Sequence, residues 1–117
     1  MAACGIDLIL NAEVSGTTST NIGSARVVTG SNTTISFRAM FGPSTEATGA
    51  IEVKRFTGGS SITELTASGI GLQDISGSAI TLPGPSTNIY NDWYDFYASG
   101  SAADVSTLIK GIRVILQ

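Results

Sequence analysis

The stretch "TTISFRAMF", residues 33–41, places an apolar side chain at every second position. The apolar set consists of Ile35, Phe37, Ala39 and Phe41. Successive side chains of a β-strand point to opposite faces, so this alternation is typical of a strand with one buried face. The segment therefore predicts a half-buried strand.

Turn-forming residues interrupt the chain on both sides of this segment. Serine, threonine, glycine and proline gather in "SGTTST", "TGSN", "FGPSTEATG", "FTGGSS", "SGIG", "SGS", "PGPST" and "ASGSA". They recur at roughly the 8–12-residue spacing that is expected of an all-β sandwich or barrel. The runs between them predict strands at residues 5–14, 24–29, 33–41, 50–56, 61–67, 79–82, 89–98 and 108–116.

One segment, residues 102–111, has the composition of a helical turn, and we expect a short helix or a loop there. No repeat or linker divides the chain. We therefore predict a single domain over residues 1–117. Its predicted fold is an all-β antiparallel β-sandwich, jelly-roll-like, with at most one short helix.

Strand pairing can be predicted for residues 50–67. A three-residue loop at 58–60, with glycine in the left-handed position, is a common hairpin form. It would place Val53 opposite Leu65, Ile51 opposite Ala67, and Lys54 opposite Glu64. Apolar pairs would then share one face and an ion pair would lie on the other, as cross-strand pairing prefers.

By the same reasoning, residues 33–40 are expected to pair with residues 50–56. This register would place Phe37 opposite Val53, Ala39 opposite Ile51, and Arg38 opposite Glu52. The three consecutive strands would then form an antiparallel meander.

The charge of the chain is low and acidic, which excludes several kinds of partner. The net charge is −3 and only 13% of the residues are charged, against about 25% in an average soluble domain. The six basic residues are scattered, so the concentrated basic surface that binds nucleic acid or an anionic membrane is missing. So little charge suits a protein whose surface is covered by its neighbours in an assembly.

The chain has no histidine and one cysteine, Cys4. Histidine is the usual general base near neutral pH and the commonest transition-metal ligand, so neither a serine triad nor a Cys–His pair can be built. A lone cysteine can form neither a zinc site nor an intrachain disulfide. We therefore expect no catalytic residue, no metal and no cofactor, and we expect Cys4 to act as a small hydrophobic side chain.

The opening segment "MAACGIDLILNAEV" lacks the basic start and the long apolar run of a signal peptide. No apolar run approaches the roughly 18 residues of a membrane-spanning helix. We therefore expect synthesis in a cytoplasm.

The stretch "NDWYDFYASG", residues 91–100, holds the tryptophan and two of the three tyrosines. If residues 93–98 form a strand, Tyr94, Phe96 and Ala98 face the core, and Trp93, Asp95 and Tyr97 face outward. The stretch is then first a core strand and second a contact surface, because subunit interfaces are rich in tyrosine and tryptophan. A sugar-binding face is the third interpretation. The predicted contact residues are Tyr90, Trp93 and Tyr97.

Asp92 and Asp95 are a candidate carboxylate pair. With Asn88 and Asn91 nearby, a calcium site in a loop is conceivable. However, two aspartates three residues apart on a strand point to opposite faces. Polar residues at the end of a strand are therefore the favoured interpretation.

The chain is poor in lysine, rich in serine, threonine and glycine, lacks a signal peptide and catalytic residues, and ends inside its last strand, "IRVILQ". In these features the whole chain resembles the small decoration or cement proteins of tailed-phage virions. The resemblance lies in composition and pattern and carries no diagnostic residue, so no site is transferred. It implies a homo-oligomer in the virion, with a trimer favoured, that binds the major capsid protein or another virion protein and reinforces the lattice.

The alternative function is a carbohydrate- or receptor-binding module of a phage fibre or adhesin, and an enzyme is the third and least favoured interpretation.

The apolar segments "IDLIL" and "IRVIL" would be costly as exposed edges. We expect them to be covered by each other within the sandwich or by a neighbouring subunit.

Overall fold

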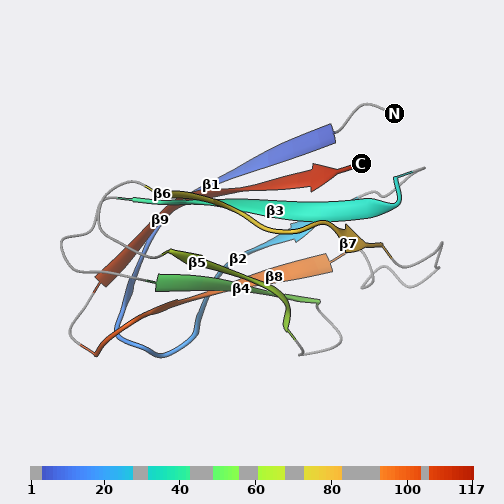
Figure 1. Ribbon diagram of the computed structural model, residues 1–117. Coiled ribbons are helices and arrows are strands. Elements are labelled where there is room, and N and C mark those ends of the chain that lie inside the picture. The colour runs from blue at the N-terminus through green and yellow to red at the C-terminus, as the bar shows by residue number, and fades with distance from the viewer. Residues whose placement is uncertain are drawn as a thin grey trace.

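The computed structural model consists of two antiparallel β-sheets packed face to face (Figure 1). It describes residues 4–27, 32–42, 49–55, 61–67, 73–82, 93–103 and 106–117. Within these ranges there is no helix, and hence none long and apolar enough to cross a membrane. The all-β antiparallel sandwich predicted from the turn spacing is confirmed.

The strand order is that of a jelly roll. Sheet A runs in the order β1 (Cys4–Ser15), β9 (Ser106–Leu116), β3 (Thr34–Phe41) and β6 (Gln73–Ser76), and β7 (Ile80–Thr81) also pairs with β3. Sheet B runs in the order β2 (Thr20–Arg26), β8 (Trp93–Gly100), β4 (Gly49–Arg55) and β5 (Ser61–Ala67). The pairings are nested: β1 with β9, β2 with β8, β3 with β6 and β7, and β4 with β5. Nested pairs divided between two sheets define this fold.

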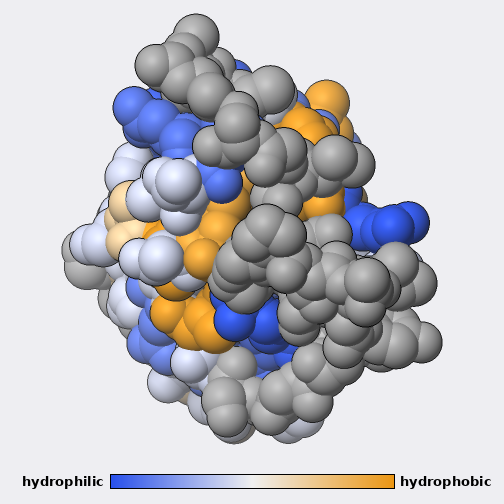
Figure 2. Space-filling view, turned by 90° about the vertical axis from the view of Figure 1, so that its right-hand side faces the viewer, coloured by the Kyte–Doolittle hydropathy of each residue, from blue (hydrophilic) through white to orange (hydrophobic). Residues whose placement is uncertain are grey.

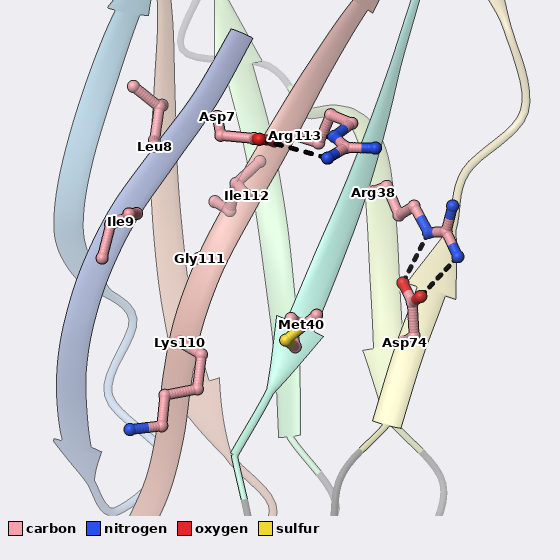
Figure 3. Close-up of a pocket in the computed structure, with 10 residues that line it drawn as sticks. All are labelled: Asp7, Leu8, Ile9, Arg38, Met40, Asp74, Lys110, Gly111, Ile112 and Arg113. Carbon is pink, nitrogen blue, oxygen red and sulfur yellow. Dashed lines mark hydrogen bonds and ion pairs between the residues drawn. The ribbon is translucent and has the colours of Figure 1, made fainter. Parts of the chain in front are cut away.

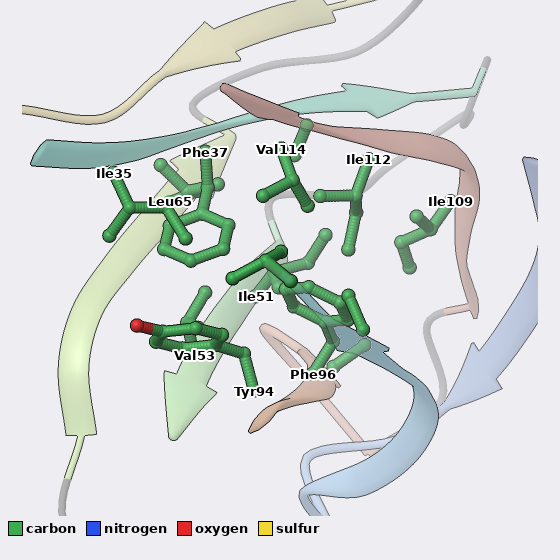
Figure 4. Packing of buried hydrophobic residues seen from close by; sticks show 14 of the residues in the cluster. Ile35, Phe37, Ile51, Val53, Leu65, Tyr94, Phe96, Ile109, Ile112 and Val114 are labelled. Carbon is green, nitrogen blue, oxygen red and sulfur yellow. The ribbon is translucent and has the colours of Figure 1, made fainter. Parts of the chain in front are cut away.

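The core lies between the sheets and takes alternate side chains from both. Phe37 of β3 is at its centre, with ring centroids 5.5 Å from Tyr94 and 5.8 Å from Phe96 of β8 (Figure 4). Every second residue of β3 from Ile35 to Phe41 is buried, and so is every second residue of β8 from Tyr94 to Ala98. The face assignments made from alternation in both segments are therefore confirmed.

Seen from the end of the sandwich, hydrophobic residues reach the surface between hydrophilic ones (Figure 2). This appearance agrees with the 13% of charged residues in the sequence.

The predicted meander is wrong. β3 pairs with β6, β7 and β9 and not with β4, so Phe37 and Val53 enter the core from opposite sheets. Ala39 and Ile51 are likewise on different sheets, and Arg38 binds Asp74 in place of Glu52. In a jelly roll, strands that are close in sequence cross from one sheet to the other. A rule that pairs each strand with the next along the chain therefore fails.

β4 and β5 do pair, but the predicted register is wrong by two residues: Leu65 lies opposite Ile51 and not opposite Val53. At a bulge between Val53 and Lys54, β5 has one residue more than β4. A shift of two leaves every side chain on its predicted face, and Ile51, Val53, Leu65 and Ala67 are all buried.

The Lys54–Glu64 ion pair predicted for this hairpin is also wrong. Glu64 lies opposite Glu52, and Lys54 Nζ pairs with Glu52 Oε1 at 3.3 Å. The predicted loop at residues 58–60 lies outside the described residues.

The chain ends are largely as expected, with one correction. Residues 106–111 belong to β9, so the predicted helix or loop over 102–111 is wrong there. Pairing with β1 on one side and β3 on the other imposes the extended backbone. The segments "IDLIL" and "IRVIL" pair with each other, with Ile6 opposite Val114, but Ile6 and Ile9 remain 44% and 82% exposed. The other edge of β1 has no strand beside it in the described part of the chain.

Candidate functional site

Two adjacent β-bulges interrupt sheet A at the same level. Between Ile9 and Ala12, β1 has one residue more than β9. Between Ile109 and Gly111, β9 has one residue more than β3. Bulges bend a strand and redirect its side chains, and they are frequent beside functional sites.

Two polar residues hold these bulges together. Asn11 has a φ of 45°, in the left-handed region that asparagine tolerates better than most residues. Lys110, which belongs to the bulge of β9, donates a hydrogen bond from Nζ to Asn11 Oδ1 at 3.3 Å. This hydrogen bond directs the exposed side chain of Lys110 toward β1 on the outer face of sheet A.

A hollow of about 350 Å³ opens on this outer face (Figure 3). Gly111 forms its floor, because Gly111 lies opposite Ile9 on one side and Met40 on the other. A Cβ at position 111 would lie 2.7 Å from the carbonyl oxygen of Leu8, so the backbone of β1 leaves no room for a side chain. Ile9 and Met40 are 82% and 47% exposed. We call this site, with its apolar walls and glycine floor, the sheet A hollow.

Two arginine–aspartate pairs border the sheet A hollow. Arg113 donates from Nε to Asp7 Oδ1 at 2.6 Å and from Nη2 to Asp7 Oδ2 at 3.1 Å. Arg38 donates in the same two-point manner to Asp74, with its Nε 2.6 Å from Asp74 Oδ1. The strand register builds both pairs: Asp7 lies directly opposite Arg113, and Asp74 lies opposite Met40, two residues along β3 from Arg38.

These hydrogen bonds change the acidity of the pairs. The bonds from Arg113 and Arg38 hold the pKa values of Asp7 and Asp74 below their usual 3.8. The same bonds raise the pKa values of both arginines. The four groups are exposed to water, so the pairs orient their side chains more than they stabilise the fold.

The outer face of sheet B holds two of the three predicted contact residues. Trp93 and Tyr97 lie on β8 with Asp95 between them, as the alternation predicted. Asp95 Oδ1 accepts a hydrogen bond from Trp93 Nε1 at 3.2 Å and another from Ser24 Oγ at 2.6 Å. Lys54 Nζ lies 4.8 Å from the centre of the Tyr97 ring. Side chains of β2 and β4 therefore hold these aromatic residues in place.

The other residues singled out in the sequence are tested only in part. Tyr90, Asn88, Asn91 and Asp92 lie outside the described residues, so the calcium interpretation stays untested. Cys4 begins β1 with its backbone opposite Leu116, and its expected inertness stays a prediction. Among the described residues, no three acidic or cysteine side chains gather where they could hold a metal ion. The expected lack of catalysis also stays a prediction.

Sequence reasoning missed the sheet A hollow, although two signals for it were present. Met40 is the apolar exception on the polar side of residues 33–41, and Ile9 stands on the same side of β1 as Asp7. A large apolar residue on the solvent side of an alternating strand marks exposed apolar surface. The role of Gly111 depends on the approach of β1, which no local pattern reveals.

No family model matches the chain, and no curated protein matches its sequence. A solved structure does match: a chain in the structure of infectious bursal disease virus Gx strain superposes with a TM-score of 0.54 at 13% identity. The superposition covers 99% of this chain and 32% of the viral chain, so this chain spans about a third of the viral chain's length. At this identity the likeness concerns the fold, which this chain shares with a chain of a virus that is not a phage.

Proposed function

We propose that this chain is a structural protein of a virus particle, a decoration or cement protein that attaches to the capsid lattice as a homo-oligomer. The observation that carries the proposal is the sheet A hollow. Ile9 is 82% exposed and Met40 47% exposed on a face that already has two ordered ion pairs around them. Exposed apolar surface with a polar border marks a contact with another molecule.

The physical gain from covering this face is straightforward. Burial of apolar surface contributes about 25 cal/mol per Å² removed from water. Polar residues around an apolar centre exclude water from it, as they do in many protein interfaces. The bidentate arginines Arg38 and Arg113 are already fixed by their aspartates, so little side-chain freedom is lost when a partner arrives.

The fold supports the proposed function less directly than the hollow does. Jelly rolls occur in viral capsid domains and in lectins, and the superposition with the virus chain covers 99% of this chain. Since fold alone does not fix function, this likeness supports the particle and not the particular role. The outer edge of β1 has no strand beside it in the described part of the chain, and this edge and the low charge support association with other copies, for which a trimer remains our proposal.

The proposal is tested on particles made from the genome that encodes the chain. Density-banded particles are analysed by quantitative mass spectrometry for the ratio of this chain to the most abundant particle protein. A lattice protein gives a fixed ratio from one preparation to the next. Its absence from intact particles contradicts the proposal, and a ratio of a few copies per particle favours a fibre. Sedimentation velocity of the purified chain separately measures whether it forms a trimer.

A carbohydrate-binding role is the second candidate, and the outer face of sheet B favours it. Trp93, Asp95 and Tyr97 combine aromatic rings with a carboxylate on one face of β8. Against it, Lys54 lies over the Tyr97 ring and Asp95 already accepts two hydrogen bonds through one oxygen. A glycan array probed with the wild-type chain and with the Trp93→Ala variant tests whether this face binds carbohydrate. Specific binding that the variant loses would establish this second function.

A further inference from the structure

The sheet A hollow has backbone at its floor and apolar side chains on both sides of the floor. Its floor is fixed by backbone, because a Cβ at Gly111 would clash with the carbonyl oxygen of Leu8. Ile9 and Met40 line the hollow from the two strands on either side of β9, and its volume is about 350 Å³ (Figure 3). The described part of the chain leaves the space between Ile9 and Met40 unfilled, so an aliphatic side chain of a partner can enter there.

The charges around the sheet A hollow are unbalanced. Three cations, Lys110, Arg38 and Arg113, face two carboxylates, Asp7 and Asp74. Each carboxylate is bound by one arginine at two points. The hydrogen bond of Lys110 goes to the neutral amide of Asn11. Lys110 therefore forms no ion pair with a carboxylate within the described part of the chain, although the whole chain has a net charge of −3.

From these two observations we propose that the sheet A hollow binds an acidic segment of a partner protein. One aliphatic side chain of the segment lies between Ile9 and Met40, and one carboxylate binds Lys110 Nζ. The inference rests on the proposed function and names the chemistry of the partner surface. Apolar contact gives most of the affinity, and the carboxylate sets the orientation and speeds the encounter.

Other occupants fit less well. A second copy in a face-to-face arrangement would bring two identical surfaces together, each with one cation in excess. A nucleic acid needs free cations for its phosphates, but Arg38 and Arg113 are paired. A neutral glycan would leave Lys110 without a counter-charge and would gain little from Ile9 and Met40.

The experiment is a selection from a displayed library of random short peptides on the immobilised full-length chain. We expect the enriched peptides to be acidic and to contain aliphatic residues. Amide NMR shifts upon titration of an enriched synthetic peptide should concentrate at Ile9, Met40, Lys110 and Gly111. Binding should weaken as salt is added, since a carboxylate–ammonium contact at the surface is screened.

Matched variants identify the contact. Lys110→Glu should weaken the peptide about tenfold or more, and Ile9→Ser should weaken it to a similar extent. Arg26→Glu makes the same change in net charge on the outer side of β2 and should leave binding unchanged. Equal weakening by Arg26→Glu would show that only the total charge matters and would overturn the proposal. Enrichment of neutral or basic peptides, or no peptide that maps to the hollow, would also overturn it.

Two further outcomes keep this inference separate from the function. Self-association of the chain that Ile9→Ser abolishes in sedimentation velocity would assign the hollow to a second copy and overturn the acidic partner. Acidic peptides that bind the hollow while the chain is missing from particles would support the inference and contradict the proposed function. A fixed ratio of this chain to the main particle protein, with no peptide that binds the hollow, would support the proposed function and contradict the inference.

Discussion

The outer faces of the two sheets differ in how far their side chains bind one another. On sheet B, Asp95 holds Trp93 and Ser24, and Lys54 joins Tyr97 to Glu52. On sheet A, the charged residues also pair, but they surround a hollow whose apolar walls face solvent.

This difference shows that residue type and exposure are separate signals. Tryptophan and tyrosine attract attention in the sequence, yet within sheet B the indole N–H of Trp93 binds Asp95 and Lys54 lies over the Tyr97 ring. Ile9 is an ordinary aliphatic residue, yet it is 82% exposed. Covering Ile9 removes apolar surface from water at no cost in existing hydrogen bonds. The sheet A hollow is therefore the stronger candidate for a docking surface.

The largest expected effect tests the division of β4 into a core face and an outer face. Val53→Asp should lower the free energy of unfolding by about 3–5 kcal/mol, because it buries an unpaired charge at a position that is fully buried. Lys54→Ala, the adjacent residue on the outer face, should cost less than about 1 kcal/mol. Urea denaturation of both variants measures the two costs, and equal costs would refute the face assignment.

The next effect tests the floor of the sheet A hollow. Gly111→Ala should destabilise by about 1–3 kcal/mol, since overpacking forces a shift where the new Cβ would lie 2.7 Å from Leu8 O. Gly5→Ala on β1 is the matched control, because its Cβ would have no neighbour closer than 3.8 Å. The free energy of unfolding of that variant should stay within about 0.5 kcal/mol of the wild-type value. Similar melting curves for both variants would show that β1 does not approach Gly111 this closely.

A third prediction sets the two outer faces against each other. Ile9→Ser should weaken attachment to particles about tenfold, or ~1.4 kcal/mol, and should leave the stability of the isolated chain within about 0.5 kcal/mol. The double variant Trp93→Ala/Tyr97→Ala makes the corresponding change on sheet B. The sequence-based prediction is that it weakens assembly more than stability. Cosedimentation with particles compares the variants, and a larger loss from the double variant would place the contact on sheet B.

The smallest expected effect is the pH dependence of the stability that the two arginine–aspartate pairs contribute. The folded pKa values of Asp7 and Asp74 are depressed by their arginine partners. Their contribution to stability is therefore present above pH 3.8 and is lost as the pH falls through the lower folded values. Asp7→Asn/Asp74→Asn should lower the melting temperature slightly at neutral pH, and the difference from wild type should vanish in strong acid. A difference that does not depend on pH would exclude ionisation of these pairs as its source.

Much of the fold could be predicted from local pattern, and the pairing of strands could not. Alternation placed Phe37, Val53 and Tyr94 in the core because burial follows a strand's own period of two. Partner choice depends on strands far apart in sequence, as in the pairing of Asp7 with Arg113. That is why the meander and the Lys54–Glu64 pair were wrong while the faces were right. β6 was missed because its four residues lie among turn-forming residues.

The candidate site was less predictable than the core. Trp93 and Tyr97 were placed on one outer face by alternation, and this part is confirmed. The sheet A hollow arises from two bulges at one level of β1 and β9. A bulge adds one residue to one strand, and its position is fixed by the neighbouring strand and not by the local sequence. Ile9 and Met40 were visible as exceptions, but Gly111 could not be recognised as a floor before β1 was placed beside it.

The central claim is that the outer face of sheet A meets the particle, and hydroxyl-radical footprinting tests it on both faces at once. The isolated chain and the chain on intact particles are oxidised under the same conditions and compared by mass spectrometry. The account predicts that Met40 and Ile9 lose reactivity on the particle while Trp93 and Tyr97 keep theirs. Protection of Trp93 and Tyr97 with unchanged oxidation of Met40 would contradict it and place the contact on sheet B.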